Sequence, residues 1–210
     1  VSVLSAASAL VPTPASAVMD SREALSLLER AKNGDTTAVD TLRQQAEAGD
    51  AVAQTALATI YLAGIGGVAK DDAEAVRWTR MAAEQGFAPA EYDLALLYFM
   101  GRGVAKDDAE SARWLQKAAD QGVPPAQNNL ALLYAVGQGV PKDLKKAAAL
   151  FRKAADQGFA ESQNNLGVLY ANGEGVKKDL KLAKQWFEKA AAQGHPAAKQ
   201  NLERLQQAQK

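Results

Sequence analysis

The chain has 210 residues, of which 48% are hydrophobic, 6% are aromatic and none is cysteine. This composition indicates a folded protein with a core of mainly small side chains, and it excludes a disulfide framework, a thiol nucleophile and a cysteine-ligated metal. The 24 basic and 24 acidic residues balance, so no overall field attracts nucleic acid or an anionic membrane.

The first predicted element is a leader or tail that covers residues 1–19. Residues 1–17 carry no charge and end in Ala15-Ser16-Ala17, which has the small-x-small form of a signal-peptidase site, although a basic n-region is lacking. The apolar run is too short to span a bilayer. We expect an export signal and hence a periplasmic or secreted protein; the alternative is a disordered tail on a cytoplasmic protein.

Residues 20–49 are predicted to form a degenerate leading unit of two helices. Asn33-Gly34 separates the helices, because glycine readily adopts the backbone conformation that ends a helix. The apolar positions expected in the core are Leu25, Leu28 and Ala31 before this break and Ala38, Leu42 and Ala46 after it.

An internal repeat of about 36 residues follows. A Gln-Gly pair closes each unit and recurs with its glycine at Gly86, Gly122, Gly158 and Gly194. The first unit carries one extra residue near Gly66, which marks a loop. The predicted units are residues 50–86, 87–122, 123–158 and 159–194.

Each unit is predicted to contain two helices, as the second unit illustrates. In its first helix the apolar spacing places one stripe toward the core, and a Gly-x-Gly turn then stops the helix. Asp107 is expected to cap the second helix, with Glu110 completing a capping box. The stripe residues are Ala90, Leu94, Leu97 and Tyr98 in the first helix and Ser111, Trp114, Ala118 and Ala119 in the second.

The last predicted element is a capping helix in residues 195–210. Leu202 and Leu205 keep the apolar positions of the repeat, but the residues that follow are polar. A terminal unit needs a polar outer face because no neighbour covers it.

The motif at Ala126 to Val140, Ala-Gln-Asn-Asn-Leu-x-x-Leu-Tyr-x-x-Gly-x-Gly-Val, is followed by Lys-Asp and Ala-Ala-x-Gln-Gly and resembles the Sel-1-like repeat family. These proteins are related to tetratricopeptide repeats. The resemblance implies an all-α fold, an α/α solenoid coiled as a right-handed superhelix, with the first helix of each unit on the concave side. It also implies a scaffold for protein complexes, in bacteria often secreted or periplasmic. Family members with cysteine pairs in each repeat differ from this chain.

Residues that could carry chemistry fit structural roles better. The Gly-x-Gly motifs follow helices rather than strands, and the only histidine, His195, has no partner histidine or cysteine for a metal or a triad. We therefore predict no catalytic residue, metal or cofactor. The tryptophans recur with the repeat and are expected in the core, and the pairs Lys145-Lys146 and Lys177-Lys178 are expected to be solvated.

One helix of the second unit is apolar on the side opposite its core stripe, where a surface helix should be polar. The two interpretations are an exposed binding groove and burial by adjacent helices. The predicted partner-binding residues on this side of the first helices are Tyr92, Leu96, Phe99, Met100, Asn128, Leu132, Val136 and Asn164.

The function expected from these features is a non-enzymatic scaffold that binds a peptide or protein partner in its concave groove. The alternative is a structural subunit of a bacterial envelope assembly that uses its outer face or its ends. Residues 1–122 carry 11 basic and 17 acidic groups, and residues 123–210 carry 13 and 7. This asymmetry would either orient a charged partner or reflect only solvated outer faces.

Overall fold

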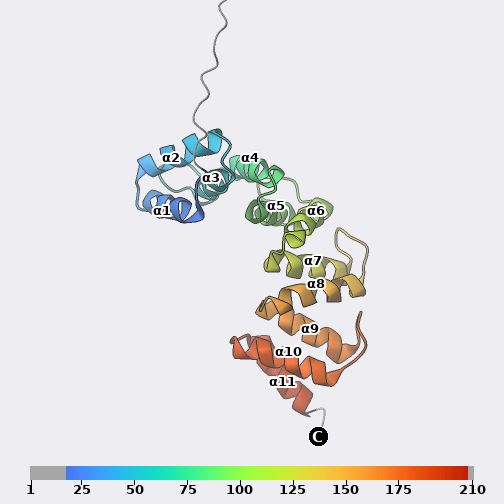
Figure 1. The fold of residues 1–210 in the computed structure, drawn as a ribbon. Helices are drawn as coiled ribbons and strands as arrows, with labels where there is room; N and C mark the ends of the chain where they lie inside the picture. The colour runs from blue at the N-terminus through green and yellow to red at the C-terminus, as the bar shows by residue number, and fades with distance from the viewer. Residues whose placement is uncertain (1–17, 208–210) are drawn as a thin grey trace, which may run out of the picture.

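A computed structural model describes residues 18–207, and this part of the chain folds into eleven α-helices that follow one another along a curved arc (Figure 1). The expected export signal, residues 1–17, lies outside the described residues. The helices are α1 (Ser21–Lys32), α2 (Thr36–Glu47), α3 (Ala51–Ala63), α4 (Asp72–Glu84), α5 (Ala88–Met100), α6 (Asp108–Asp120), α7 (Pro124–Val136), α8 (Leu144–Asp156), α9 (Ala160–Asn172), α10 (Leu180–Ala192) and α11 (Pro196–Gln207).

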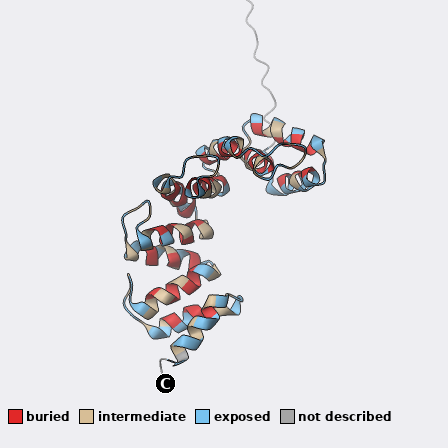
Figure 2. Cartoon of the chain, turned by 180° about the vertical axis from the view of Figure 1, so that it is seen from behind, coloured by how far each residue is buried: buried red, intermediate tan, exposed pale blue. Residues whose placement is uncertain are grey.

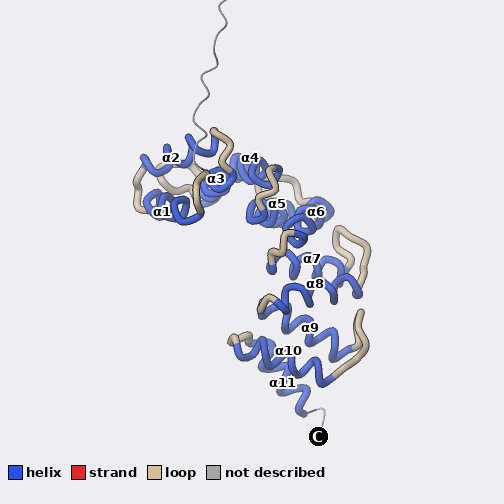
Figure 3. Tube along the Cα trace, in the orientation of Figure 1, coloured by secondary structure: helices blue, strands red, loops and turns tan. Residues whose placement is uncertain are grey.

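Each helix packs mainly against its neighbours in sequence, so the molecule is a stack of helix pairs. From α3 onward, the loops within a pair are long and the turns between pairs are short, as the α7 to α10 part of Figure 3 shows. Contacts between helices two apart join α1 to α3 and α3 to α5, so the first helices of successive pairs meet. The all-α solenoid of helix-turn-helix repeats is confirmed.

The buried residues run along the stack between the helices (Figure 2). They are largely alanine and leucine. The four predicted apolar residues of α5 are all buried. Trp78, Trp114 and Trp186 are also buried, which confirms the prediction that they belong to the core rather than to a ligand site. Basic side chains cover their rings from the solvent side; the Nζ of Lys117, for example, lies 4.0 Å from the Trp114 ring centre.

The predicted core stripe of α1 was wrong in one position. Leu25 is 65% exposed, Leu28 is half-buried against the core, and the buried residues are Ala24, Leu27 and Ala31. Spacings of three and four residues join these positions, so they form one stripe on a helix, and Leu25 lies beside it. The larger side chain was mistaken for the buried one. In α2, the predicted residues Ala38, Leu42 and Ala46 are all buried.

The start of α6 confirms the predicted cap and corrects the capping box. The Asp107 carboxylate accepts hydrogen bonds from the backbone N–H groups of Ala109 and Glu110. The Glu110 carboxylate instead pairs with Arg113, at 2.6 Å. The backbone N–H of Asp107 donates to the carbonyl of Tyr98, so it is already satisfied and needs no glutamate.

The second glycine of each Gly-x-Gly turn lies against the preceding repeat. Gly139 has a φ of +69°, and a Cβ placed there would lie 2.1 Å from the backbone oxygen of Asp108, at the start of α6. The same close approach occurs at Gly103 and Gly175. The turn is therefore both a helix stop and a contact between repeats, which only glycine permits.

The glutamine of each Gln-Gly pair fixes the spacing between repeats. Gln121 donates to the carbonyl oxygen of Gly86 and to the carboxylate of Glu91, at 2.9 and 2.8 Å. Two repeats later, Gln193 makes the matching hydrogen bonds, to the carbonyl oxygen of Gly158 and the side-chain oxygen of Gln163. The repeating Gln-Gly pair thus has a physical reason: its side chain satisfies polar groups of the preceding unit.

Candidate partner-binding face

The exposed apolar side chains of α5 and α7 form a continuous surface, which we call the first-helix face. It consists of Leu96, Phe99 and Met100 on α5 and Leu132 and Val136 on α7. Met100 and Val136 are 58% and 67% exposed, and Phe99 and Leu132 are exposed to about 40%. Leu96 is half-buried. These five predicted site residues therefore lie together, and four of them are exposed to solvent.

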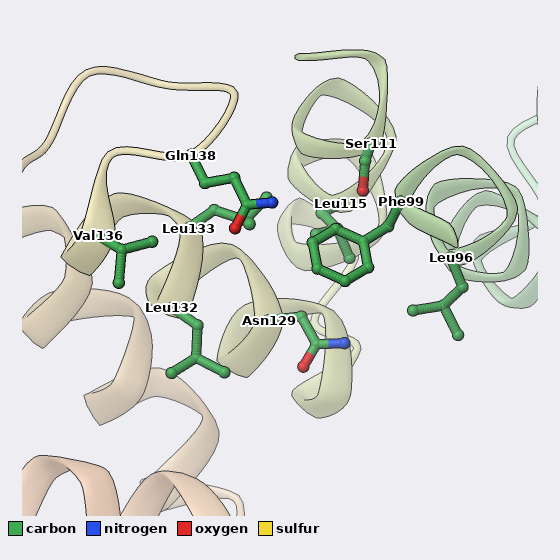
Figure 4. Close-up of a pocket in the computed structure, with 9 residues that line it drawn as sticks. All are labelled: Leu96, Phe99, Ser111, Leu115, Asn129, Leu132, Leu133, Val136 and Gln138. Atoms are coloured by element: carbon green, nitrogen blue, oxygen red, sulfur yellow. The ribbon is translucent and has the colours of Figure 1, made fainter. Parts of the chain in front are cut away.

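A pocket of about 330 Å³ opens between α5 and α7 (Figure 4). This volume is at the low end of the range for ligand sites. Apolar side chains dominate the walls, and α6 supplies the floor. The lining residues are Leu96, Phe99, Ser111, Leu115, Asn129, Leu132, Leu133, Val136 and Gln138.

Ser111 places a polar atom at the floor of this pocket. The residue is 1% exposed, and its hydroxyl has no hydrogen-bond partner within the described part of the chain. The other units have alanine at this position, at Ala75, Ala147 and Ala183. An unsatisfied buried hydroxyl costs stability, so its presence at the pocket floor needs an explanation.

Leu115 forms part of the pocket floor, at a position where the size of the side chain varies between repeats. The next two units have phenylalanine there, at Phe151 and Phe187, and both rings are 2% exposed. In the last unit the ring of Phe187 packs against Gly167, where a Cβ would come within 2.6 Å. Leu115 is smaller than these rings, but Phe187 also lines a hollow, between α9 and α11.

A second hollow, of about 220 Å³, lies between α3 and α5. Leu96 lines both hollows, so its side chain forms the wall between them. The polar groups of the second hollow are Thr55 and Thr59 on α3, Thr79 on α4, Asp93 on α5 and Arg102 in the loop after α5.

Asp93 is half-buried in this second hollow and makes no hydrogen bond or ion pair with any described residue. Burial raises the pKa of its carboxyl group to about 6, because desolvation penalises the charged form. The guanidinium of Arg102 is already bound to the carboxylate of Asp72 and the carbonyl of Leu62, at 2.8 Å each.

Asparagine side chains connect the first helices of successive repeats. Asn165 donates to Asn128, at 3.2 Å, and Asn201 donates to Asn164, at 2.9 Å. Asn128 and Asn164 are 6% and 8% exposed, so the structure places these two predicted site residues inside the stack. Their hydrogen-bonding groups serve contacts between repeats.

Tyr92 continues this series in the second unit, where its hydroxyl accepts a hydrogen bond from Asn129, at 3.3 Å. Its ring is half-buried against the core. Desolvation raises the pKa of the Tyr92 hydroxyl, and the hydrogen bond from Asn129 opposes this shift. Of the eight predicted site residues, three are thus tied to the stack and five form the exposed face.

The four helix pairs from α3 to α10 correspond to four copies of a known repeat. A family model described as Sel1 repeat matches residues 51–87, 88–123, 124–159 and 160–195. The chain belongs to the Sel1 repeat family. The comparison with curated proteins gave no match.

Two solved Sel1-type structures resemble the chain. A Sel1 repeat protein from Oxalobacter formigenes is 43% identical, with a TM-score of 0.75 over 81% of this chain and 50% of its own. The protein c5321, a protective antigen in uropathogenic Escherichia coli strains with an SLR fold, is 42% identical, with a TM-score of 0.74 over 76% of this chain and 34% of its own. The chain therefore spans at most half the length of these two proteins.

More distant structures share only the fold. The immunity protein Pa5087 from Pseudomonas aeruginosa is 24% identical, with a TM-score of 0.52 over 84% of this chain and 68% of its own.

The only histidine of the Sel1 repeats, His195, has a structural role. The Nδ1 of His195 accepts a hydrogen bond from the backbone N–H of Ala198, so this side chain caps the start of α11. Between residues 18 and 207, no group of three histidine, cysteine or carboxylate side chains is arranged to hold a metal ion. No helix within the same residues is long and apolar enough to cross a membrane.

Sequence reasoning missed the polar groups of the two hollows. Ser111 and Asp93 each differ from the residue at the same position of other units. The other units have alanine in place of Ser111, and the two units that follow have asparagine in place of Asp93. Such departures from a repeat were the available signal. The pocket itself could not be predicted, because it depends on how α5 and α7 pack over α6.

Proposed function

We propose that the chain is a non-enzymatic scaffold that binds a segment of a partner protein on the first-helix face. The supporting observation is the α5–α7 pocket, whose apolar walls are continuous with exposed Phe99, Met100, Leu132 and Val136. Soluble proteins seldom expose large side chains in a contiguous group without a binding role. A pocket flanked by exposed apolar anchors is the usual centre of a protein interface.

The opposite side of the molecule supports this choice of face. The second helices carry exposed arginine and lysine side chains over their tryptophans, such as Arg77, Arg113 and Lys189. Arg77 and Arg113 are already paired with Glu74 and Glu110, and lysine is depleted from the centres of protein interfaces. We therefore favour the first-helix face over the outer face as the contact surface.

The test uses peptides selected from a random dodecapeptide display library on the immobilised protein. We expect Leu132→Glu to weaken binding of the selected peptides by roughly 1–3 kcal/mol, because it places a charge in the apolar pocket. The control is Leu25→Glu, at the exposed leucine of α1. Equal affinity of the wild type and Leu132→Glu, measured by calorimetry, would reject the proposal.

A further inference from the structure

The two hollows on either side of Leu96 differ in chemistry. The α5–α7 pocket is apolar and holds one buried hydroxyl, that of Ser111, without a partner. The α3–α5 hollow holds the Asp93 carboxylate, which also lacks a partner among the described residues. Both unused polar groups face the surface to which the proposed function assigns binding.

We infer that the bound segment carries two side chains: an aromatic ring with a hydrogen-bonding group, as in tyrosine or tryptophan, for the α5–α7 pocket, and an arginine or lysine for Asp93. This inference rests on the proposed function and adds the chemistry of the partner. It depends on the contacts of Asp93, Ser111 and Leu96.

Asp93 selects for a cation because of what it replaces. The equivalent residues Asn129 and Asn165 donate hydrogen bonds to the preceding repeat. An ionised carboxylate has no hydrogen to donate, so Asp93 cannot join this series. It remains as an acceptor on the surface of the hollow.

Within residues 18–207, no cation pairs with Asp93. The residues that line its hollow from α3 and α4 are threonine, alanine and leucine, none of which titrates. On α5 the adjacent titratable group is the Tyr92 hydroxyl, which is bound to Asn129. Arg102 lines the same hollow but is held by Asp72. A half-buried carboxylate without a partner attracts a guanidinium or ammonium group and repels an acidic segment.

Ser111 determines which apolar side chain fits best. A purely aliphatic anchor would fill the pocket but leave the buried hydroxyl unsatisfied. A tyrosine hydroxyl or a tryptophan N–H can supply the missing hydrogen bond while its ring contacts Phe99 and Leu133. The pocket therefore favours an aromatic ring with a polar group over phenylalanine or leucine.

The distance between the hollows sets the spacing of the two side chains. Neighbouring packed helices lie about 8–10 Å apart, and an extended chain covers about 10 Å in three residues. A segment that crosses α5 over Leu96 would thus place its basic and aromatic residues about three positions apart.

The experiment uses the same random dodecapeptide library on the complete chain. We expect the selected peptides to pair arginine or lysine with tyrosine or tryptophan at this spacing. Against such a peptide, Asp93→Asn should lower the affinity about tenfold or more, because the cation loses its partner. This variant should fold, because asparagine occupies the same position in the following units. Asp156→Asn removes the same charge at an exposed position of α8 and should leave the affinity unchanged.

Two further measurements separate the two side chains. Replacing tyrosine by phenylalanine in the peptide should weaken binding to the wild type several-fold but not to Ser111→Ala. Binding of an arginine-containing peptide to the wild type should weaken between pH 7.5 and pH 5.5, because Asp93 has a pKa of about 6 and becomes protonated. The Asp93→Asn variant should show no such change.

The outcomes distinguish the inference from the proposed function. If peptides bind and Leu132→Glu disrupts them, but basic residues are not enriched and Asp93→Asn binds equally well, this inference is wrong and the proposed function stands. If no peptide binds in a manner sensitive to Leu132→Glu, both fail.

Discussion

Single residues that depart from the repeat distinguish this molecule from a regular solenoid. We expect one of them, Asp93, to affect stability as well as binding. Its raised pKa, about 6 against 3.8, means that the folded chain is stabilised when Asp93 is protonated and loses this stabilisation as the pH rises through 6. The shift corresponds to at most about 3 kcal/mol, and partial exposure reduces it. We expect Asp93→Asn to raise the free energy of unfolding by about 1–2 kcal/mol at pH 7.5.

The gain from Asp93→Asn should shrink toward zero near pH 4, where the carboxyl group is largely protonated in the folded chain. Urea unfolding at the two pH values measures this difference. An equal gain at both would show that a new hydrogen bond, and not the removed charge, stabilises the variant.

Phe99 and Tyr92 are neighbours on α5 with different expected roles. Phe99 is 38% exposed, so Phe99→Ala should lower the free energy of unfolding by only about 1 kcal/mol but weaken partner binding by roughly 1–3 kcal/mol. Tyr92 is half-buried and bonded to Asn129, so Tyr92→Ala should cost about 2–3 kcal/mol of stability. Thermal unfolding and calorimetry of both variants test this division; equal stability losses would contradict it.

At the scale of helices and turns, the glycine contacts between repeats can be tested with a matched pair. Gly122 and Gly139 both have positive φ, but only Gly139 lies against backbone of another repeat. Gly122→Ala should cost about 1–2 kcal/mol from backbone strain alone. Gly139→Ala adds a clash with the Asp108 carbonyl and should cost about 3 kcal/mol or more. Similar losses in urea unfolding would mean that the repeats adjust freely.

The elements themselves were largely predictable because each has a local cause. Helix spacing, Asp107 as a cap and the Gln-Gly stops are all properties of neighbouring residues. The exposed apolar side of α5 was also visible in its spacing. The burial of Asn128 and Asn164 was not, because it depends on hydrogen bonds between residues 37 positions apart. The same limit applies to Leu25, since its exposure depends on how α1 packs.

For the molecule as a whole, the stack of alanine-rich helix pairs implies stability without a metal ion. The clusters of buried hydrophobic residues run from α1 to α10. We expect a chelator such as EDTA to leave the melting temperature unchanged, as measured by helical circular dichroism. A clear decrease would reveal a metal that contributes to folding.

Residues 1–17 lead to a prediction about the mature protein. Because Ala15-Ser16-Ala17 has the form of a signal-peptidase site, we expect protein isolated from its host to begin at or near residue 18 and to be found outside the cytoplasm. N-terminal sequencing of the isolated protein decides this. A cytoplasmic protein that retains Val1 would refute export.

The most direct test of partner binding in the α5–α7 pocket is the affinity of Leu115→Phe. The larger side chain should occupy part of the pocket, and the equivalent Phe151, which is 2% exposed in one cluster with Ala131, indicates that the repeat accommodates a phenyl ring there. Calorimetry with a partner segment, supported by the melting temperature, compares this variant with the wild type. Partner binding in the pocket predicts an affinity loss of about tenfold or more at an unchanged or higher melting temperature. Unchanged affinity in a fully folded Leu115→Phe variant would contradict it.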